Sequence, residues 1–390
     1  MAEWQTVRLG TIVSTNQNTY SPKENWQFVN YLDTGNITMN RVDEIQCINI
    51  LTDKLPSRAR RKVKSNSIIY STVRPNQLHY GIIKEQPENF LVSTGFAVID
   101  VDFKKAVPDY IYYALTQQEV TEHLQAIAEQ SVSAYPSIKP SDIENLELLL
   151  PDKNTQGKIV SILKSIDEKI KQNNEINNNL EQQLHLLFIQ IFNGISEDVV
   201  LGDVVETTSG GTPSRKHTEY YENSSICWVK SKELLGNYIL DTEEHINDIA
   251  LSKSSAKLLP MHSVLIAMYG ATVGAYGIIS KSMTCNQAVC ALLCNEKYPY
   301  TYLFQIAQEQ QQKLINMAVG SAQQNISQVL IKQLPLHSDI AAIRKFHNLA
   351  LPLHKQIEKL QAENRTLSEM RDTLLPQLMS GKLDVSDIDL

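Results

Sequence analysis

Cations and side-chain amides gather in several stretches of the first half of the chain. A basic run holds Arg58, Arg60, Arg61, Lys62 and Lys64; Arg74, Asn76 and Gln77 follow, and Tyr135 and Ser137 come later. Arginine can bond guanine O6 and N7, asparagine and glutamine can bond adenine N6 and N7, and lysine neutralises phosphates. These residues are therefore candidates for contacts with DNA. The alternative is that the basic run is only a solvated surface.

The second half carries a comparable set around two adjacent glycines. Gly210 and Gly211 open a polar segment that ends in two cations, and we expect a flexible loop that approaches a phosphate backbone closely. The candidates for DNA contact here are Thr212, Ser214, Arg215, Lys216, Tyr220, Lys230, Lys232, Asn286, Gln323, Gln324 and Asn325. A purely structural interpretation stays open, since Gly-Thr-Pro-Ser is also an ordinary turn and residues 323–325 can simply end a helix.

The bulk composition limits the class of protein. A formal net charge of −7 over 390 residues counts by itself against a nucleic-acid binder. Charge must be read locally, however, because a helical spacer can carry the acidic residues while the binding faces stay basic. The sequence has no apolar window of about 18 residues and no signal-peptide pattern at its start. We therefore expect a cytoplasmic protein of two or more domains without membrane contact.

Signatures of catalysis and of metal binding are weak or missing. Cys285, Cys290 and Cys294 could be metal ligands, but reduced apolar residues in strands are the simpler interpretation, and we predict no metal site. The sequence has neither a G-x-x-x-x-G-K-[ST] phosphate loop nor the Asn/Asp-Pro-Pro-aromatic motif of amino-methyltransferases. We expect His185 and His354 at the surface of long helices. The chain is predicted to be non-catalytic and to hold no cofactor of its own.

Two long helices with a repeating apolar stripe must position these residues. The first stripe is Ile159, Leu163, Ile166, Ile170, Asn173, Asn177, Leu180, Leu184, Leu187 and Ile191. The second is Phe346, Ala350, Leu353, Ile357, Leu360, Asn364, Leu367, Arg371, Leu374 and Leu378, at a constant offset (357 − 170 = 187; 378 − 191 = 187). Spacing by alternating fours and threes predicts the seam of a coiled coil. The polar seam residues are expected to fix its register, unless they are only frayed or exposed positions.

The segments before the two helices repeat each other as well. Leu9-Gly10 matches Leu201-Gly202 (201 − 9 = 192), the sequence Tyr-Gly-Ile-Ile at 80–83 recurs at 276–279 (276 − 80 = 196), and Ser-Ala at 133–134 recurs at 321–322 (321 − 133 = 188). We predict domains at 1–151 and 196–338, a spacer helix at 152–195, and a second spacer helix with a C-terminal tail at 339–390. Residues 109–129 are expected to form one amphipathic helix. Antiparallel pairing of the long helices would make a rod of roughly 50 Å, on the scale that separates two half-sites on DNA.

Several short motifs in this order resemble those of the specificity (S) subunits of Type I restriction–modification systems, over essentially the whole chain. They are SGGTPS at 209–214, YY at 220–221, WV at 228–229, TCNQ at 284–287, GSAQQNI at 320–326, and STVRPN at 71–76. The resemblance implies an α+β fold: two mixed α/β target recognition domains in pseudo-twofold tandem repeat, separated by two long helices in an antiparallel coiled coil. Each domain would read one half of a split double-stranded DNA target.

The same resemblance implies partners. The paired helices would set the gap and dock two methyltransferase subunits, which recruit restriction/translocase subunits; S-adenosylmethionine, ATP and magnesium are expected only on those partners. Residues 134–137 read AYPS where residues 322–325 read AQQN, so the two domains should read different bases. Two alternatives stay open: a coiled-coil adaptor with protein-binding terminal domains, and a DNA-binding regulator that acts without methylation.

Overall fold

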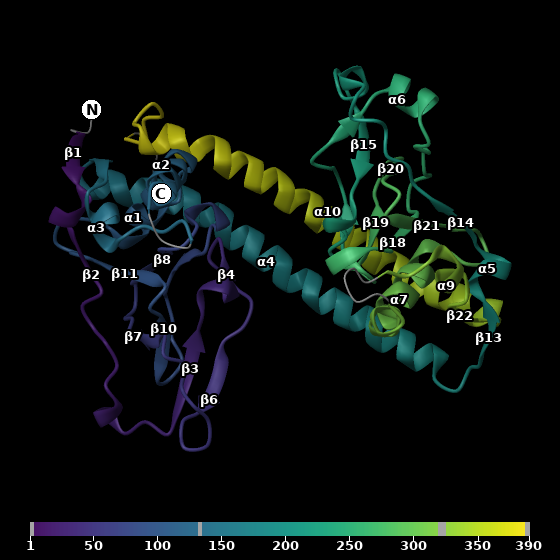
Figure 1. The fold of residues 1–390 in the computed structure, drawn as a ribbon, viewed down its shortest axis with the longest axis horizontal. Coiled ribbons are helices and arrows are strands. Elements are labelled where there is room, and N and C mark those ends of the chain that lie inside the picture. Colours follow the sequence, from purple (N-terminus) through teal and green to yellow (C-terminus); the bar gives the residue numbers. More distant parts are fainter. Residues whose placement is uncertain (1–3, 132–134, 319–324, 387–390) are drawn as a thin grey trace. The chain divides into compact units, whose positions relative to one another are not determined.

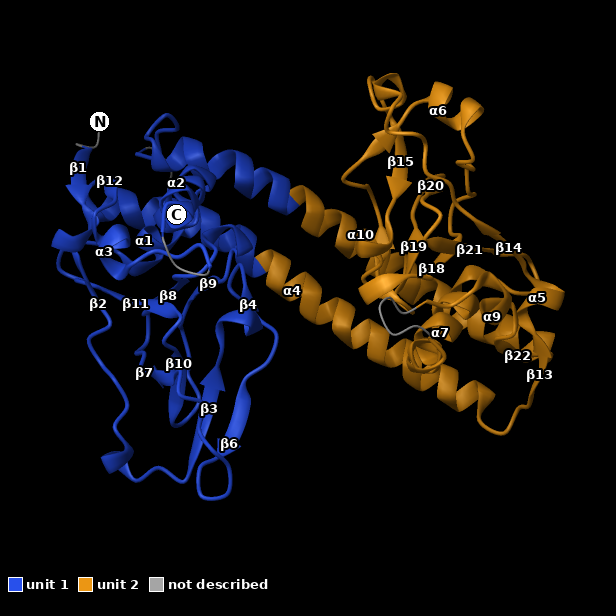
Figure 2. Ribbon diagram, viewed as in Figure 1, with its two compact units in different colours: residues 1–168, 367–390 blue, residues 169–366 orange. Residues whose placement is uncertain are grey.

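The computed structural model describes residues 4–131, 135–318 and 325–386 (Figure 1). Helices α4 (Lys153–Phe192) and α10 (Ile340–Met379) have 40 residues each. The chain divides into two compact units: unit 1 comprises residues 1–168 and 367–390, and unit 2 comprises residues 169–366 (Figure 2). The sequence-based division treated both helices as separate segments. The structure instead gives each unit one end of α4 and the opposite end of α10, because those ends pack into the unit's core.

The two long helices have the same kinds of residue at their ends, an aspartate before the first turn and a glycine after the last. Asp152 accepts hydrogen bonds from the backbone of residues 154 and 155 (2.9 and 3.1 Å), and Asp339 accepts one from the backbone of residue 342 (3.0 Å). Such bonds satisfy amide groups that the first turn of a helix leaves free. Gly194 and Gly381 follow the last turns with φ of +82° and +71°, a conformation that glycine adopts without strain. The repeat therefore includes the helix boundaries (339 − 152 = 187).

Contacts inside each unit show that α4 and α10 run antiparallel. In unit 2, the amide of Asn173 donates to Asn364 (2.9 Å), and the ring of Phe188 lies 5.5 Å from that of Phe346. In unit 1, Arg371 pairs with Asp167 (3.1 Å). Every position of the two predicted seams is buried or half-buried, including Asn173 and Asn177. The predicted antiparallel coiled coil is confirmed.

Unit 1 contains two four-stranded sheets. The first, called the main sheet, has the order β2 (Val13–Thr15), β11 (Phe96–Val101), β8 (Ile68–Ser71) and β9 (Tyr80–Ile82). The second sheet has the order β6 (Gln46–Asn49), β3 (Phe28–Leu32), β10 (Phe90–Ser93) and β7 (Ala59–Arg61). Two-stranded pairs join β1 (Gln5–Arg8) to β12 (Glu147–Leu150) and β4 (Ile37–Thr38) to β5 (Arg41–Val42). The helices are α1 (Pro108–Leu115), α2 (Gln118–Glu129) and α3 (Pro140–Glu144).

The expectation of one helix over residues 109–129 is wrong in one respect. Helix α1 ends before Thr116, and α2 starts only after Gln117, whose φ of −61° and ψ of 143° are extended. The Thr116 hydroxyl donates to the carbonyl of Tyr113 (3.1 Å), a local bond that competes with helix continuation. The apolar spacing runs across this break, so periodicity alone does not reveal it.

Unit 2 repeats this plan. Its main sheet has the order β14 (Glu206–Ser209), β21 (Val289–Leu293), β18 (Val264–Ala267), β19 (Tyr276–Ile279) and β16 (Tyr238–Ile239), and a second sheet has the order β17 (His245–Ile246), β15 (Ile226–Val229) and β20 (Thr284–Cys285). Strand β13 (Glu197–Val200) pairs with β22 (Pro335–His337). The helices are α5 (Leu201–Val204), α6 (Asp248–Lys253), α7 (Tyr300–Glu309), α8 (Gln311–Asn316) and α9 (Gln328–Lys332).

Strand pairing confirms the internal repeat. In unit 1 Val7 pairs with Leu148 and Ile69 with Gly81; in unit 2 Val199 pairs with Leu336 and Leu265 with Gly277. The offsets of these four pairing partners (199 − 7 = 192; 336 − 148 = 188; 265 − 69 = 196; 277 − 81 = 196) equal those found in the sequence. The two units therefore share both their motifs and their strand register.

The main sheet of each unit is covered on both faces. Side chains that alternate along a strand point to opposite faces. In unit 1 Ile68 packs in a core with the helices, whereas Ile69 packs with the second sheet. In unit 2 Val264 and Leu265 divide in the same way. In each unit the second sheet thus lies on the face of the main sheet away from the long helices, as Figure 1 shows for β3, β6 and β10.

The described helices include none that is both long enough and apolar enough to cross a lipid bilayer.

Candidate nucleic-acid interface

Arg215 lies in a cradle of aromatic and acidic side chains in unit 2. Its guanidinium group is 4.4 Å from the ring centre of Tyr221 and 5.4 Å from that of Trp228. It also forms an ion pair with Glu244, and its side chain stays 56% exposed. A planar cation that stacks on aromatic rings and keeps an open edge is suited to phosphate or guanine. Trp228 is on β15, so the second sheet positions this cation.

The segment that carries Arg215 is anchored to the sheet. The indole Nε1 of Trp228 donates to the carbonyl of Gly211 (3.0 Å), and the hydroxyl of Tyr221 donates to that of Pro213 (2.7 Å). A Cβ atom on Gly210 would lie 2.0 Å from the carbonyl oxygen of residue 285, and one on Gly211 would lie 2.3 Å from the backbone of residue 255. The expectation of a flexible loop is therefore wrong for Gly210 and Gly211. Both glycines allow close contact between protein backbones.

Lys230 and Lys232 follow β15 and contact two adjacent carboxylates. Lys230 forms an ion pair with Glu244, and the Nζ atom of Lys232 is 2.6 Å from a carboxylate oxygen of Glu243. The hydrogen bond from Lys230 lowers the pKa of Glu244; burial opposes this shift, and the bond from Arg215 adds to it. Three candidate cations of unit 2 thus share two carboxylates. Neither glutamate is among the residues predicted from the sequence to contact DNA.

The other candidates of unit 2 differ in exposure. Ser214 and Lys216 are exposed, and the exposed Thr212 donates a hydrogen bond to Gln287. Tyr220 is only 7% exposed, because it packs in a small core with Trp228, so its selection as a contact residue is wrong on grounds of burial.

The two amide-bearing loops of unit 2 are placed by backbone contacts. Asn286 is half-buried, and its side chain accepts a hydrogen bond from the backbone of residue 288 (3.1 Å). The exposed Asn325 forms a β-bridge with Tyr269. Gln323 and Gln324 lie outside the described residues.

The basic run of unit 1 begins one residue before strand β7 and continues beyond its end. Arg58 and Arg60 are exposed, whereas Arg61 and Lys62 are half-buried. Lys62 forms an ion pair with Glu24 and lies 5.0 Å from the ring centre of Trp26. The ring of Trp26 is itself 4.7 Å from that of Tyr20. Unit 1 therefore also holds a cation between a carboxylate and an indole.

Two further groups of candidates meet in unit 1. The backbone N–H of Arg74 donates to the carbonyl of Pro136 (3.0 Å), and Val73 forms a β-bridge with Ser137. The guanidinium group of Arg74 lies 5.3 Å from the ring centre of Tyr135, which is 61% exposed. Asn76 and Gln77 are exposed in the next turn. The bridge between residues 73 and 137 corresponds to that between Tyr269 and Asn325 (269 − 73 = 196; 325 − 137 = 188).

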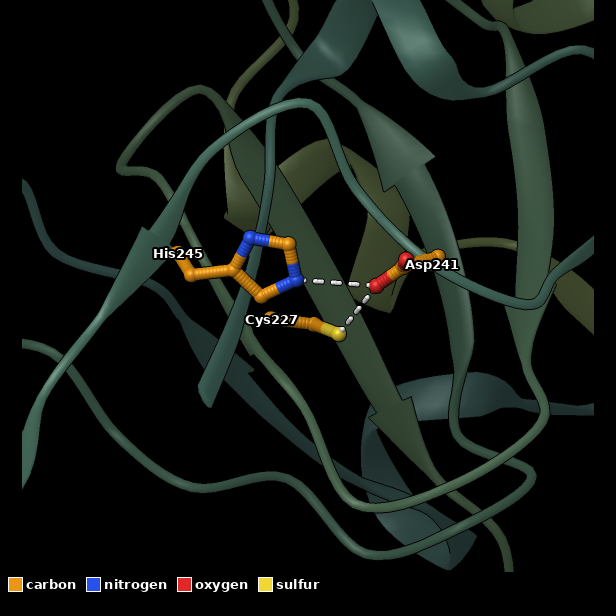
Figure 3. Close-up of side chains that lie close together, drawn as sticks. All are labelled: Cys227, Asp241 and His245. Atoms are coloured by element: carbon orange, nitrogen blue, oxygen red, sulfur yellow. Dashed lines mark hydrogen bonds and ion pairs between the residues drawn. The ribbon is translucent and has the colours of Figure 1, made fainter. Parts of the chain in front are cut away.

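Cys227, Asp241 and His245 form a compact cluster in unit 2. One carboxylate oxygen of Asp241 accepts from the thiol of Cys227 (3.1 Å) and contacts Nε2 of His245 (2.9 Å), as Figure 3 shows. These three residue types could hold a metal ion. However, Arg365 of α10 (2.6 Å) and Lys281 (3.8 Å) already neutralise Asp241, and burial together with the bond to Asp241 raises the pKa of the Cys227 thiol. The contacts are explained as a charge-balanced cluster, and we do not assign a metal to it.

Cys285, Cys290 and His354 are buried, and Cys294 is half-buried. Burial raises the pKa of Cys285, Cys290 and Cys294 to about 12, so these thiols stay neutral. The expectation that His354 lies at the surface is wrong: it is 1% exposed and contacts the hydroxyl of Tyr238 (3.0 Å). Burial lowers its pKa to about 3, which keeps the imidazole neutral. His185 contacts a carboxylate oxygen of Glu309 (2.6 Å).

Comparison with known proteins adds independent information. The "Type I restriction enzyme HindI specificity subunit" of Haemophilus influenzae is 23% identical, over 98% of this chain and 100% of its own length. The "Type I restriction enzyme MjaIX specificity subunit" of Methanocaldococcus jannaschii is 24% identical, over 72% of this chain and 70% of its own. A solved structure of a Type I restriction-modification S subunit from M. genitalium is similar in fold, with a TM-score of 0.59 and 16% identity over 97% of this chain and 96% of that one.

The family model for the "Type I restriction modification DNA specificity domain" matches residues 1–182 and 195–337. Those two ranges contain both of the cation sites described above, at Lys62 and at Arg215. With both halves of the repeat matched and most of the sequence covered, the chain belongs to this family of Type I DNA specificity proteins.

Proposed function

We propose that each unit reads one half of a split double-stranded DNA target, and that the antiparallel helices set the gap between the halves. The observation that carries this proposal is the repeated pair of bridges, Val73–Ser137 in unit 1 and Tyr269–Asn325 in unit 2, which place candidate residues at equivalent positions of the repeat (269 − 73 = 196; 325 − 137 = 188). Each unit also holds a cation against an indole on the face of its main sheet away from the long helices, although these two cation sites lie at different positions of the repeat (228 − 26 = 202; 215 − 62 = 153). Two units of one fold, each with its own candidate contact residues, would need two half-sites. The side chains beside the corresponding bridges differ, with Arg74 and Tyr135 in unit 1 and Tyr269 and Asn325 in unit 2, which supports different bases in the two halves.

The helices would also dock two methyltransferase subunits, which in turn recruit restriction/translocase subunits. Exposed apolar side chains support a docking role for the helices: Ile176, Leu186 and Ile189 on α4, and Leu349 and Met370 on α10. Leu186 and Ile189 are three residues apart and so lie on one face of α4, and contiguous exposed apolar surface is typical of a face that a partner covers. S-adenosylmethionine, ATP and magnesium would act on those partners, and the whole complex would work on DNA in the cytoplasm.

Methylation mapping of native DNA tests the proposal. Genomic DNA is sequenced from cells with and without this gene, and methylated adenines are recorded. We expect a motif of two short base blocks around a fixed unspecified gap, present only when the gene is present. If both base blocks remain methylated after the gene is deleted, the proposed role is contradicted. That result would favour an adaptor, or a regulator that acts without methylation.

A further inference from the structure

Glu24 in unit 1 and Glu244 in unit 2 have similar chemical surroundings, although their positions are not equivalent in the repeat (244 − 24 = 220). Each carboxylate forms an ion pair with a cation that the sequence nominates for DNA contact, Lys62 and Arg215 respectively. Each of those cations also faces an indole ring, at 5.0 Å in unit 1 and at 5.4 Å in unit 2. We name each arrangement of carboxylate, cation and indole a latch: Glu24–Lys62–Trp26 and Glu244–Arg215–Trp228.

Hydrogen bonds position the carboxylate of Glu24 and the backbone of Glu244. One oxygen of Glu24 accepts from the backbone N–H of Ser21 (2.9 Å), which leaves the other for Lys62. In unit 2 the carbonyl of Glu244 accepts from the backbone of Trp228 (3.1 Å) and from the hydroxyl of Thr242 (2.7 Å). The carboxylate of Glu24 is thus bound to its own turn, and the backbone of Glu244 is fixed beside Trp228.

A carboxylate and a phosphate diester compete for the same donors. Both carry one negative charge on two outward oxygen atoms that accept charge-assisted hydrogen bonds. In unit 2 the two oxygens of Glu244 bond separately to Arg215 and Lys230, as two phosphate oxygens would. Glu243 adds a second carboxylate at Lys232 (2.6 Å). A DNA backbone that approaches these cations must replace the glutamates and also meets their repulsion.

We propose that Glu24 and Glu244 are specificity-determining residues that occupy the phosphate-binding cations of the free chain and so suppress binding to DNA that lacks the target. This inference rests on the proposed function. On a correct half-site, base contacts offset the cost of opening the latch. On other sequences this cost is not offset, so the cations stay paired with the glutamates. Binding to random DNA, which depends almost entirely on attraction between cations and phosphates, is then weak.

Charge-neutral variants test the proposal in the full-length chain purified with its modification subunits. Glu244→Gln and Glu24→Gln keep the size and hydrogen-bonding capacity of the side chain. Binding is titrated on a duplex with the mapped motif and on a scrambled duplex, over a range of salt. We expect each variant to bind scrambled DNA on the order of three- to tenfold more tightly, with a salt slope steeper by about one, and to lose target preference by a similar factor.

Matched controls separate local release of a cation from a general change in charge. Glu296→Gln in unit 2 and Glu85→Gln in unit 1 remove the same charge from exposed positions, and neither glutamate has an ion pair among the described residues. Both controls should bind like the unmodified complex. Melting curves of all four variants confirm that each remains folded.

The possible outcomes distinguish the proposal from its alternatives. Weaker binding of Glu244→Gln to both duplexes would mean that the carboxylate only orients its cations, and it would overturn the proposal. Lost discrimination at a single base would assign the glutamate to base reading and would overturn it as well, as would unchanged binding. If the unmodified complex itself fails to prefer the mapped motif, the proposed function fails, whatever the variants do.

Discussion

Asp241 joins three parts of unit 2 through one carboxylate. Its oxygens contact Cys227 on β15 (3.1 Å), His245 on β17 (2.9 Å) and Arg365 on α10 (2.6 Å), with Lys281 at 3.8 Å. Burial alone would raise the pKa of this carboxyl group, but the hydrogen bonds from Cys227, Arg365 and His245 outweigh it and hold the pKa well below the ordinary value of 3.8. The folded state thus favours the ionised form.

Asp241→Asn should destabilise unit 2 in a pH-dependent way. A carboxyl group with a lowered pKa stabilises the fold fully above its unfolded pKa, and this stability is lost as pH falls through the folded pKa. We therefore expect the variant to lose about 1–2 kcal/mol of unfolding free energy at neutral pH, and the difference to shrink only below about pH 4. Urea unfolding at several pH values measures it. Asp203→Asn, an exposed aspartate in α5, is the control and should show little loss; an equal loss there would assign the effect to general charge.

At the residue scale, candidate DNA-contacting side chains could be predicted from residue type, but the residues that pair with them could not. Arg215 and Glu244 lie on either side of Trp228 and Lys230 in the sequence (228 − 215 = 13; 244 − 230 = 14), and Glu244 meets Lys230 because β15 pairs with β17. Tyr220 and Tyr221 are adjacent and of one type, yet one is buried and the other stacks on Arg215. Burial of single side chains depends on tertiary packing, which neighbouring residues in the sequence do not specify.

At the scale of elements, the two long helices could be predicted from the spacing of their apolar residues. An apolar stripe that repeats over this length is typical of a coiled coil and of few other structures. The polar seam positions are less uniform than their spacing suggests. Among the described residues the side-chain oxygens of both Asn173 and Asn177 lack a hydrogen-bond partner. The amide nitrogen of Asn173, however, donates to Asn364 across the seam, a bond that the 5% exposed Asn177 does not form. Two asparagines four residues apart therefore differ in what they contribute to stability.

Asn177→Leu should stabilise the coiled coil. The substitution removes a buried acceptor that lacks a partner and adds apolar surface at a seam position, so we expect a gain of about 1–2 kcal/mol in unfolding free energy. Asn179→Leu is the matched control, because Asn179 is exposed on the same helix, and it should change stability by less than about 0.5 kcal/mol. Thermal and urea unfolding of both variants measure the difference. A loss of stability in Asn177→Leu would show that this side chain is satisfied in solution.

At the scale of the whole molecule, two repeated units and two repeated helices suggest that helix length determines the distance between half-sites. Residues 171–177 of α4 face residues 360–366 of α10, as the bond between Asn173 and Asn364 shows. Removing both heptads keeps the apolar seam in phase and shortens each helix by about 10 Å. At 3.4 Å per base pair, we expect the unspecified gap of the motif to shrink by about three base pairs while both base blocks stay the same. Methylation mapping with the shortened chain gives the gap directly.

Removing residues 171–177 alone leaves the two helices unequal and should abolish methylation of either motif. A doubly shortened chain that still methylates the original gap would refute a ruler made of these helices and would assign the gap to the bound partners.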